Sequence, residues 1–193
     1  MFEKYLVSNV GLGNYGSAGY HYKIMKKNLL KLCLIQALLI PSSILAQEPK
    51  FINVYNDWYV FTIKQNNNNV CFLTSKASKS EGAYSKRGDV LFIVTHRPAE
   101  KSLGVINFRT GYSFKKDMDA IITINNNEFY LFTQGSDGWA KDSKTDKLIV
   151  TAMIRGSKMQ IKGISSRGTM TTDTFSLSGF TAAYKAASKA CKV

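Results

Sequence analysis

The residues best suited to chemistry lie in the stretch Ile161–Phe180, which collects hydroxyl side chains and glycines around Arg167. Ser165 and Ser166 stand near its start, and a serine hydroxyl acts as a nucleophile when an adjacent base accepts its proton. His96 is the histidine available for that role once the N-terminal leader described below is set aside. Together these residues would support a hydrolase.

The spacing of the glycines around the two serines favours a turn instead. A hydrolase nucleophile normally sits on a sharp strand-to-helix elbow with the pattern G-x-S-x-G. Here Gly163 and Gly168 stand one residue too far apart, and a strand pattern follows them. We predict a turn whose hydroxyls bond the backbone and whose Gly168 adopts an unusual φ. A hydrolase using the Ser165-Ser166 loop stays as the alternative, and no catalytic residue is assigned.

The cysteines, histidines and acidic residues of the chain do not form the pattern of a metal or cofactor site. A structural zinc site uses four Cys or His ligands at close spacing, whereas the chain after residue 46 holds Cys71, His96 and Cys191 far apart. The acidic run Asp142–Asp146 carries Lys144 where a calcium loop needs a ligand. We therefore predict no metal and no cofactor, and we interpret this acidic run as a turn that caps the next element.

The segment 25–46 has the layout of a secretory signal peptide, with lysines, an apolar run over Leu32–Ile40, a proline and then small residues. The apolar run is much shorter than the roughly 20 residues that span a bilayer, so we expect no membrane anchor. We predict cleavage between Ala46 and Gln47. The mature domain would then cover residues 47–193, in the periplasm, at the cell surface or in the medium.

Residues 1–24 make an overlong preamble to such a leader, and the simplest interpretation is that translation starts at Met25. They would then be a dispensable or non-native extension. The preamble contains the pattern G-x-G-x-x-G at Gly11–Gly16, but the sequence that follows is basic where a dinucleotide site needs an acid. We therefore predict no dinucleotide site.

Export bears directly on the two cysteines of the predicted mature domain. Cysteines of small exported domains usually pair, because the compartment is oxidising. We predict a disulfide between Cys71 and Cys191, which would fasten the C-terminus to the first hairpin. Closing so long a loop would stabilise the domain by about 4–5 kcal/mol in the chain-entropy model. The alternative is two separately buried thiols.

The positive net charge of the chain indicates which classes of partner it could bind. The 193 residues carry a formal net charge of +13, with a pI near 9.6, which suits an anionic surface. Export removes the protein from the usual nucleic acids, so we expect none as a partner. The basic positions that we predict to contact an anionic surface such as lipid headgroups are Lys115, Lys116, Lys162 and Arg167. The alternative is that these are ordinary solvated charges.

Short β-type runs separated by turn residues account for most of the mature domain. Asn66–Asn69 and Asn125–Asn127 are predicted hairpin loops, because Asn tolerates the positive φ of tight turns. The fold class is therefore mainly β. The predicted strand segments are Val54–Ile63, Val70–Ser75, Asp89–Pro98, Gly104–Phe114, Ala120–Gln134 (a hairpin), Lys158–Ser165 and Thr169–Leu177.

Two helices are expected near the C-terminal end. The segment 146–155 mixes β-branched residues with apolar residues at helical spacing, and we predict a short helix over a strand. A final helix near 179–191, capped by Ser178, would lie flat on the sheet. Its apolar stripe comprises Phe180, Ala183, Tyr184, Ala187 and Cys191.

The order of motifs along this domain resembles the invasion-associated locus B family. The residues that carry the resemblance are Trp58, Cys71, His96–Pro98, Gly111-Tyr112, Trp139, Asp146 with Ala152–Gly156, Ser165–Thr169, Asp173–Phe180 and Cys191. The resemblance implies a secreted envelope protein of Gram-negative bacteria, built as an immunoglobulin-like β-sandwich and associated with host-cell invasion. It supplies no catalytic or ligand residues.

We therefore predict a non-enzymatic envelope protein that acts by binding. Its partner would be an envelope or host-cell component, including an anionic membrane surface, and we expect no small-molecule substrate. A rigid sandwich whose end loops vary suits such a role. The sequence does not identify the partner.

Overall fold

The computed structural model describes residues 48–193, and a structural unit runs from Pro49 to Val193. The predicted leader over 25–46, its cleavage site between Ala46 and Gln47 and the extension over 1–24 lie outside the described residues and stay predictions. Within residues 48–193, no helix is both long and apolar enough to cross a bilayer.

Strands dominate the described chain and pair into an 11-stranded antiparallel sheet with the order β1-β2-β3-β5-β6-β9-β8-β7-β10-β11-β4. The first half of this sheet consists of β1 (Lys50–Tyr55), β2 (Trp58–Gln65), β3 (Asn68–Lys76), β5 (Leu91–Arg97), β6 (Ser102–Arg109) and β9 (Asp137–Trp139). The second half consists of β8 (Asn127–Gln134), β7 (Ala120–Ile124), β10 (Lys158–Ile164), β11 (Met170–Ser176) and β4 (Lys79–Gly82). The short strand β9 joins the halves by pairing with both β6 and β8.

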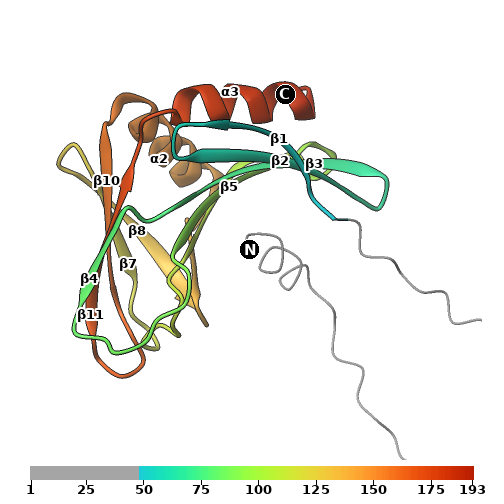
Figure 1. The fold of residues 1–193 in the computed structure, drawn as a ribbon. Helices are drawn as coiled ribbons and strands as arrows, with labels where there is room; N and C mark the ends of the chain where they lie inside the picture. Colours follow the sequence, from blue (N-terminus) through green and yellow to red (C-terminus); the bar gives the residue numbers. More distant parts are fainter. Residues whose placement is uncertain (1–47) are drawn as a thin grey trace, which may run out of the picture. The chain divides into compact units, whose positions relative to one another are not determined.

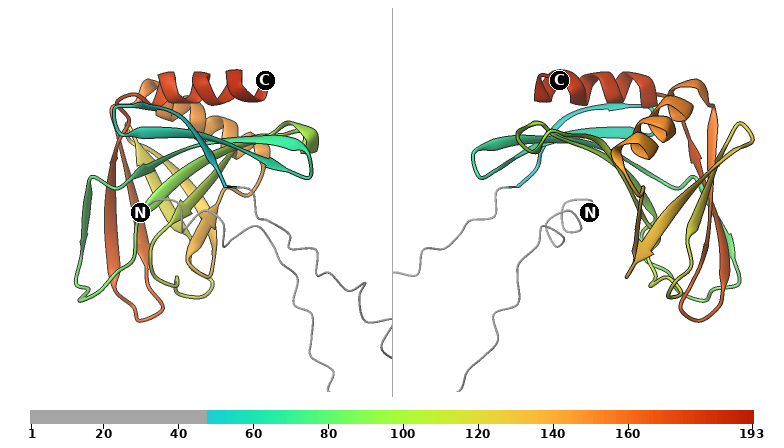
Figure 2. Two further views of the ribbon diagram at one scale, coloured as in Figure 1. Left: turned by 45° about the vertical axis from the view of Figure 1, so that its right-hand side comes forward. Right: turned by 180° about the vertical axis from the view of Figure 1, so that it is seen from behind.

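The two halves turn sharply toward each other (Figures 1 and 2). Buried side chains from both halves form one hydrophobic core. Phe175 of β11 packs against Phe92 of β5 and Phe108 of β6, with ring centroids 5.9 and 6.1 Å apart. The indole N–H of Trp58 on β2 donates to the Ser176 carbonyl, 3.1 Å away. The mainly-β, sandwich-like prediction is confirmed.

Two helices cover part of the same face of the first half. Helix α3 (Phe180–Cys191) lies along β1, β2 and β3, whereas α2 (Ser143–Arg155) packs mainly on β6 and touches α3 (Figures 1 and 2). A short 3₁₀ turn, η1 (Pro98–Glu100), follows β5. Trp58 meets Phe180 of α3 with ring centroids 4.9 Å apart, so the helices complete the core that the sheet begins.

Both predicted helices are present, with differences at their starts. Helix α2 begins at Ser143, before the predicted 146, because the Asp142 carboxylate caps it by accepting from the Thr145 N–H. The predicted cap of α3 was wrong. Gly179 is the N-cap without any side-chain cap, and the Ser178 hydroxyl accepts from the Asn56 side chain instead. The apolar stripe of α3 is confirmed, with Tyr184 half-buried and the rest buried.

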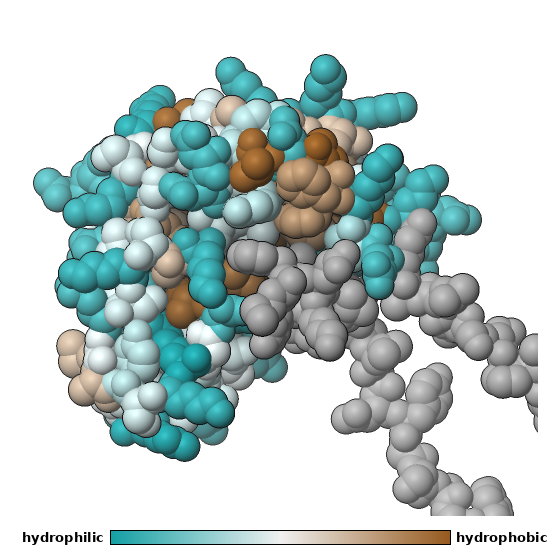
Figure 3. Space-filling view, in the orientation of Figure 1, coloured by the Kyte–Doolittle hydropathy of each residue, from teal (hydrophilic) through white to brown (hydrophobic). Residues whose placement is uncertain are grey.

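The predicted strand over 54–63 is in fact divided between β1 and β2. Asn56 adopts a positive φ of 50°, and the chain reverses there, because the aromatic run can pair with itself across a two-residue turn. The other Asn turns match prediction, since Asn66, Asn67, Asn125 and Asn126 all have positive φ. The reversal leaves β1 at the edge of the sheet with exposed apolar side chains, and Figure 3 shows hydrophobic residues gathered over β1 and β2.

Gly179 provides a test of how α3 is fastened to the sheet. Its φ is +86°, and a Cβ there would overlap the Tyr55 carbonyl. Gly135 has a φ of +59° with nothing within 4 Å of a Cβ, so it is the matched control. We expect Gly135→Ala to cost about 1–2 kcal/mol, the strain of a positive φ alone. Gly179→Ala should cost clearly more in urea unfolding, and equal costs would show that the contact with Tyr55 is unimportant.

Candidate functional site

The serines of the Ser165-Ser166 loop form a turn between β10 and β11. The Ser165 N–H donates to the Thr169 carbonyl at 2.9 Å, and the Ser165 hydroxyl oxygen accepts from the Thr169 N–H at 3.1 Å. Gly168 closes the turn with a φ of +84° and an N–H donated to the Ser165 carbonyl. The prediction of a turn is confirmed, and the Ser165 hydroxyl is hydrogen-bonded to the backbone within it.

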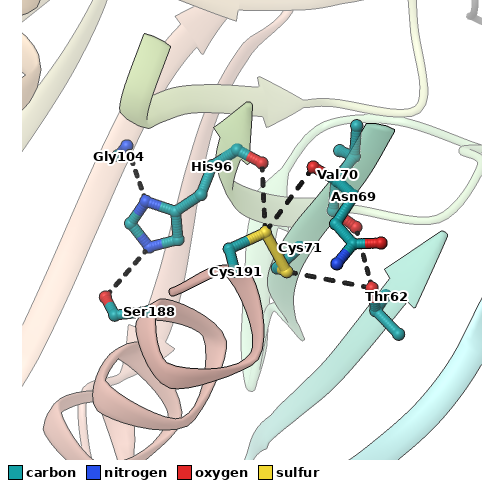
Figure 4. Close-up of a disulfide and its surroundings, with 8 residues drawn as sticks. All are labelled: Thr62, Asn69, Val70, Cys71, His96, Gly104, Ser188 and Cys191. Carbon is teal, nitrogen blue, oxygen red and sulfur yellow. Dashed lines mark hydrogen bonds between the residues drawn. A yellow bond between two sulfur atoms is a disulfide. The ribbon is translucent and has the colours of Figure 1, made fainter. Parts of the chain in front are cut away.

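His96, the base of the alternative hydrolase reading, points into a different neighbourhood (Figure 4). Its Nδ1 accepts from the Gly104 N–H at 3.2 Å, which places the ring proton on Nε2. Nε2 lies 3.4 Å from the Ser188 hydroxyl, and the ring packs against Tyr184. The structure therefore engages both ring nitrogens with groups other than Ser165 and Ser166.

The predicted disulfide is formed between Cys71 of β3 and Cys191, the last residue of α3 (Figure 4). The Cα atoms are 5.8 Å apart, within the range that a disulfide spans. The main-chain oxygens of Asn69 and His96 lie 3.7 and 3.8 Å from the Cys191 sulfur. The bond and His96 thus belong to one buried cluster that holds the end of α3 on the sheet.

The four basic residues singled out in the sequence lie on neighbouring segments. The Lys115 N–H donates to the Ile164 carbonyl, which brings the loop carrying Lys115 and Lys116 beside the turn that holds Arg167. Lys162 lies exposed on the adjoining part of β10. Two exposed carboxylates, Asp117 and Asp119, follow in the same loop, so the charge of this patch is mixed.

The sequence analysis missed a buried ion pair between Arg87 and Asp173. The guanidinium binds both carboxylate oxygens, at 2.7 and 2.6 Å, and its Nε donates to the Thr110 carbonyl at 2.6 Å. The two side chains are only 4% and 0% exposed. The rings of Tyr84 and Tyr112 lie 5.3 and 4.7 Å from the guanidinium carbon. A desolvated charge of this kind is stable only when its partners are complete, as they are here.

One signal in the sequence pointed to this pair. The alternation of β11 places Asp173 on the same face as the buried Phe175. A carboxylate on a buried face requires a partner, but the partner lies 86 residues away and no local pattern identifies it.

Within residues 48–193, no three His, Cys, Asp or Glu side chains are grouped so that they could hold a metal ion. Asp146 is buried at the start of α2, where its carboxylate accepts from the Ile106 N–H of β6 at 2.9 Å. Burial raises the pKa of this carboxyl. Asp146 therefore fastens α2 to the sheet.

The sequence model of the Invasion associated locus B (IalB) protein family matches residues 58–188, most of the described fold. The chain belongs to the IalB family. The crystal structure of invasion associated protein B from Bartonella henselae is similar at a TM-score of 0.53 and 16% identity, covering 72% of this chain and 96% of that one. At that identity the likeness concerns the fold. No curated protein matches the chain significantly.

Three of the residues that carried the sequence resemblance have structural roles in the fold. Trp58, Asp146 and Asp173 are all buried, and each makes a long-range hydrogen bond to another element. These three residues therefore help to hold the fold of this chain together. Cys191 lies just beyond the matched residues, so the disulfide rests on the structure itself.

Removing one partner of the buried ion pair should strongly destabilise this IalB-family fold. Asp173→Asn leaves the Arg87 cation without a countercharge, and we expect a loss of about 3–5 kcal/mol in the free energy of unfolding. The double variant Arg87→Met with Asp173→Leu removes both charges and should recover a large part of that loss. A single variant within about 0.5 kcal/mol of wild type, the usual scatter of surface substitutions, would contradict this account.

His96 should make the stability of the fold depend on pH. Burial lowers the pKa of His96 below its ordinary 6.5, so the unfolded chain takes up the proton first as pH falls. Stability should therefore decrease as pH is lowered from about 7.5 through 6.5, and level off below the folded pKa. His96→Gln, measured by thermal unfolding between about pH 7.5 and 5.5, should flatten this slope. An unchanged slope would mean that other groups cause it.

Proposed function

We propose that this IalB-family chain is an exported envelope protein that acts by binding a partner during host-cell invasion. The family is invasion-associated. The observation that carries the export part is the disulfide between Cys71 and Cys191, buried between β3 and α3. Such a bond persists in oxidising compartments and is rare in the cytosol. The leader-like segment 25–46 supports the same location, in the periplasm or at the cell surface.

Binding without catalysis is supported by how the candidate chemical groups are used. The Ser165 hydroxyl accepts from the Thr169 N–H, and His96 contacts Gly104 and Ser188. The Arg87–Asp173 pair is fully engaged inside the fold. A mechanism of acyl transfer needs a base within hydrogen-bond reach of its nucleophile. The described residues instead form a rigid scaffold whose loops and helix faces remain available for contact.

Export is tested by cell fractionation with intact-mass measurement. We expect the protein in the periplasmic or outer fractions, with an N-terminus at Gln47. We also expect no thiol labelled in the denatured, unreduced protein, because Cys71 and Cys191 are bonded. A cytosolic protein that keeps Cys33 of the uncleaved leader and has three free thiols would refute the proposal.

Variants in the producing bacterium separate binding from catalysis. Ser165→Ala with Ser166→Ala should leave host-cell invasion unchanged, because neither hydroxyl is assigned a chemical step. Cys71→Ala with Cys191→Ala should lower the amount of folded protein, since the bond contributes about 5 kcal/mol in the chain-entropy model. Loss of invasion by the serine variant at normal protein levels would favour the hydrolase alternative.

A further inference from the structure

The outward faces of α2 and α3 carry charge of one sign. Each helix buries an apolar stripe against the sheet, and the residues on its other side are exposed. The exposed charged side chains of the two helices are all cationic: Lys144, Lys147, Arg155, Lys185 and Lys189. We call these residues, with Leu148 and Ile154, the helical face. In Figure 3 long hydrophilic side chains project from the top of the molecule, where α3 lies.

Nearby acids offset little of this charge: Asp142, the exposed N-cap of α2, stands two residues before Lys144. Asp146 is the acid within the two helices, and it is buried and bonded to the Ile106 N–H. Among residues 48–193, the basic side chains that form ion pairs are Lys76, Lys79, Arg87, Arg97 and Arg109, none of which lies on these helices. The helical face therefore presents a positive field to an external partner.

Apolar side chains lie among the cations of α2. Leu148 is 52% exposed and Ile154 is 44% exposed. With Lys144, Lys147 and Arg155 they recur at helical spacing on the outward side of one helix. Cations interleaved with aliphatic residues are typical of helices that lie in the headgroup region of a bilayer.

We propose that the helical face binds the surface of a membrane containing anionic phospholipids. The cations would contact headgroup phosphates, and Leu148 and Ile154 would reach the acyl boundary. A soluble polyanion would satisfy the cations but would leave both aliphatic side chains in water. This inference rests on the proposed function, because export brings the protein to such a surface.

The patch formed by Lys115, Lys116, Lys162 and Arg167 fits this role less well. It is the patch that the sequence pointed to, yet Asp117 and Asp119 stand in its loop. Like charges at a membrane surface repel, so these carboxylates weaken attraction to anionic lipid. Neutralising three lysines of this patch supplies a matched control, because it removes the same amount of charge at another place on the surface.

The test measures binding of the full chain to phosphatidylcholine vesicles with and without phosphatidylglycerol. All variants are made in the full chain, so residues 1–47 contribute equally to each. The helical-face variant is Lys144→Gln, Lys147→Gln and Lys189→Gln, and the control is Lys115→Gln, Lys116→Gln and Lys162→Gln. Each cation near an anionic surface is worth about a fivefold change in binding, so the helical-face variant should bind about 100-fold more weakly. The control should change much less.

Two further measurements complete the test. Leu148→Gln with Ile154→Gln should weaken binding to anionic vesicles and leave binding to heparin unchanged, because heparin offers no acyl layer. Equal losses in the two lysine variants would overturn the inference, since net charge alone would then explain binding. Heparin binding through the helical face without vesicle binding would also overturn it. A cytosolic protein that binds vesicles as predicted would refute export and leave membrane binding by the helical face supported. An exported protein that does not bind anionic vesicles would refute membrane binding and leave export supported.

Discussion

The buried pair of Arg87 and Asp173 is the interaction on which the arrangement of the second half of the sheet depends. Asp173 lies in the middle of β11, between β10 and β4, and Arg87 reaches it from the loop that leads into β5. The same guanidinium binds the Thr110 carbonyl at the end of β6. One side chain thus connects both halves of the sheet. Its cost of desolvation is offset only if every partner is in place.

The residues around the pair allow Arg87 to reach Asp173 and shield both side chains from water. Tyr112 covers the guanidinium and bonds the Thr171 hydroxyl, 2.8 Å away, and burial raises the pKa of its phenol. Gly111, at a φ of +74°, lies against Gly88 so closely that a Cβ would overlap the Gly88 carbonyl. The backbone must approach here for Arg87 to enter the core, which explains why glycine stands at both places.

The second constraint acts at the other end of the molecule, where α3 closes the core. The disulfide to Cys71 and the contacts of His96 keep the last turn of α3 against β3 and β5. With its inner side fixed, the helix presents Lys185 and Lys189 to solvent. Loops at the β10–β11 end carry mixed charge, whereas the exposed charges of the two helices are all positive. The charged groups are therefore distributed unevenly over the surface of the fold.

Local patterns in the sequence determined much of this structure. Alternation and apolar runs predicted most of the strands, although β4 and β9 were missed. The Asn doublets at 66–67 and 125–126 marked turns, and the stripe of α3 was evident from its spacing, because each depends on residues a few positions apart. Two cysteines, taken with the prediction of export, were enough to predict their bond. The reversal of the run over 54–63 at Asn56 is a local two-residue turn, which the sequence analysis did not separate from the strand. Tertiary structure alone decided that Arg87 meets Asp173. It also decided that Phe175 of β11 meets Phe92 of β5. These outcomes depend on pairings between distant segments, whose energies no local periodicity encodes.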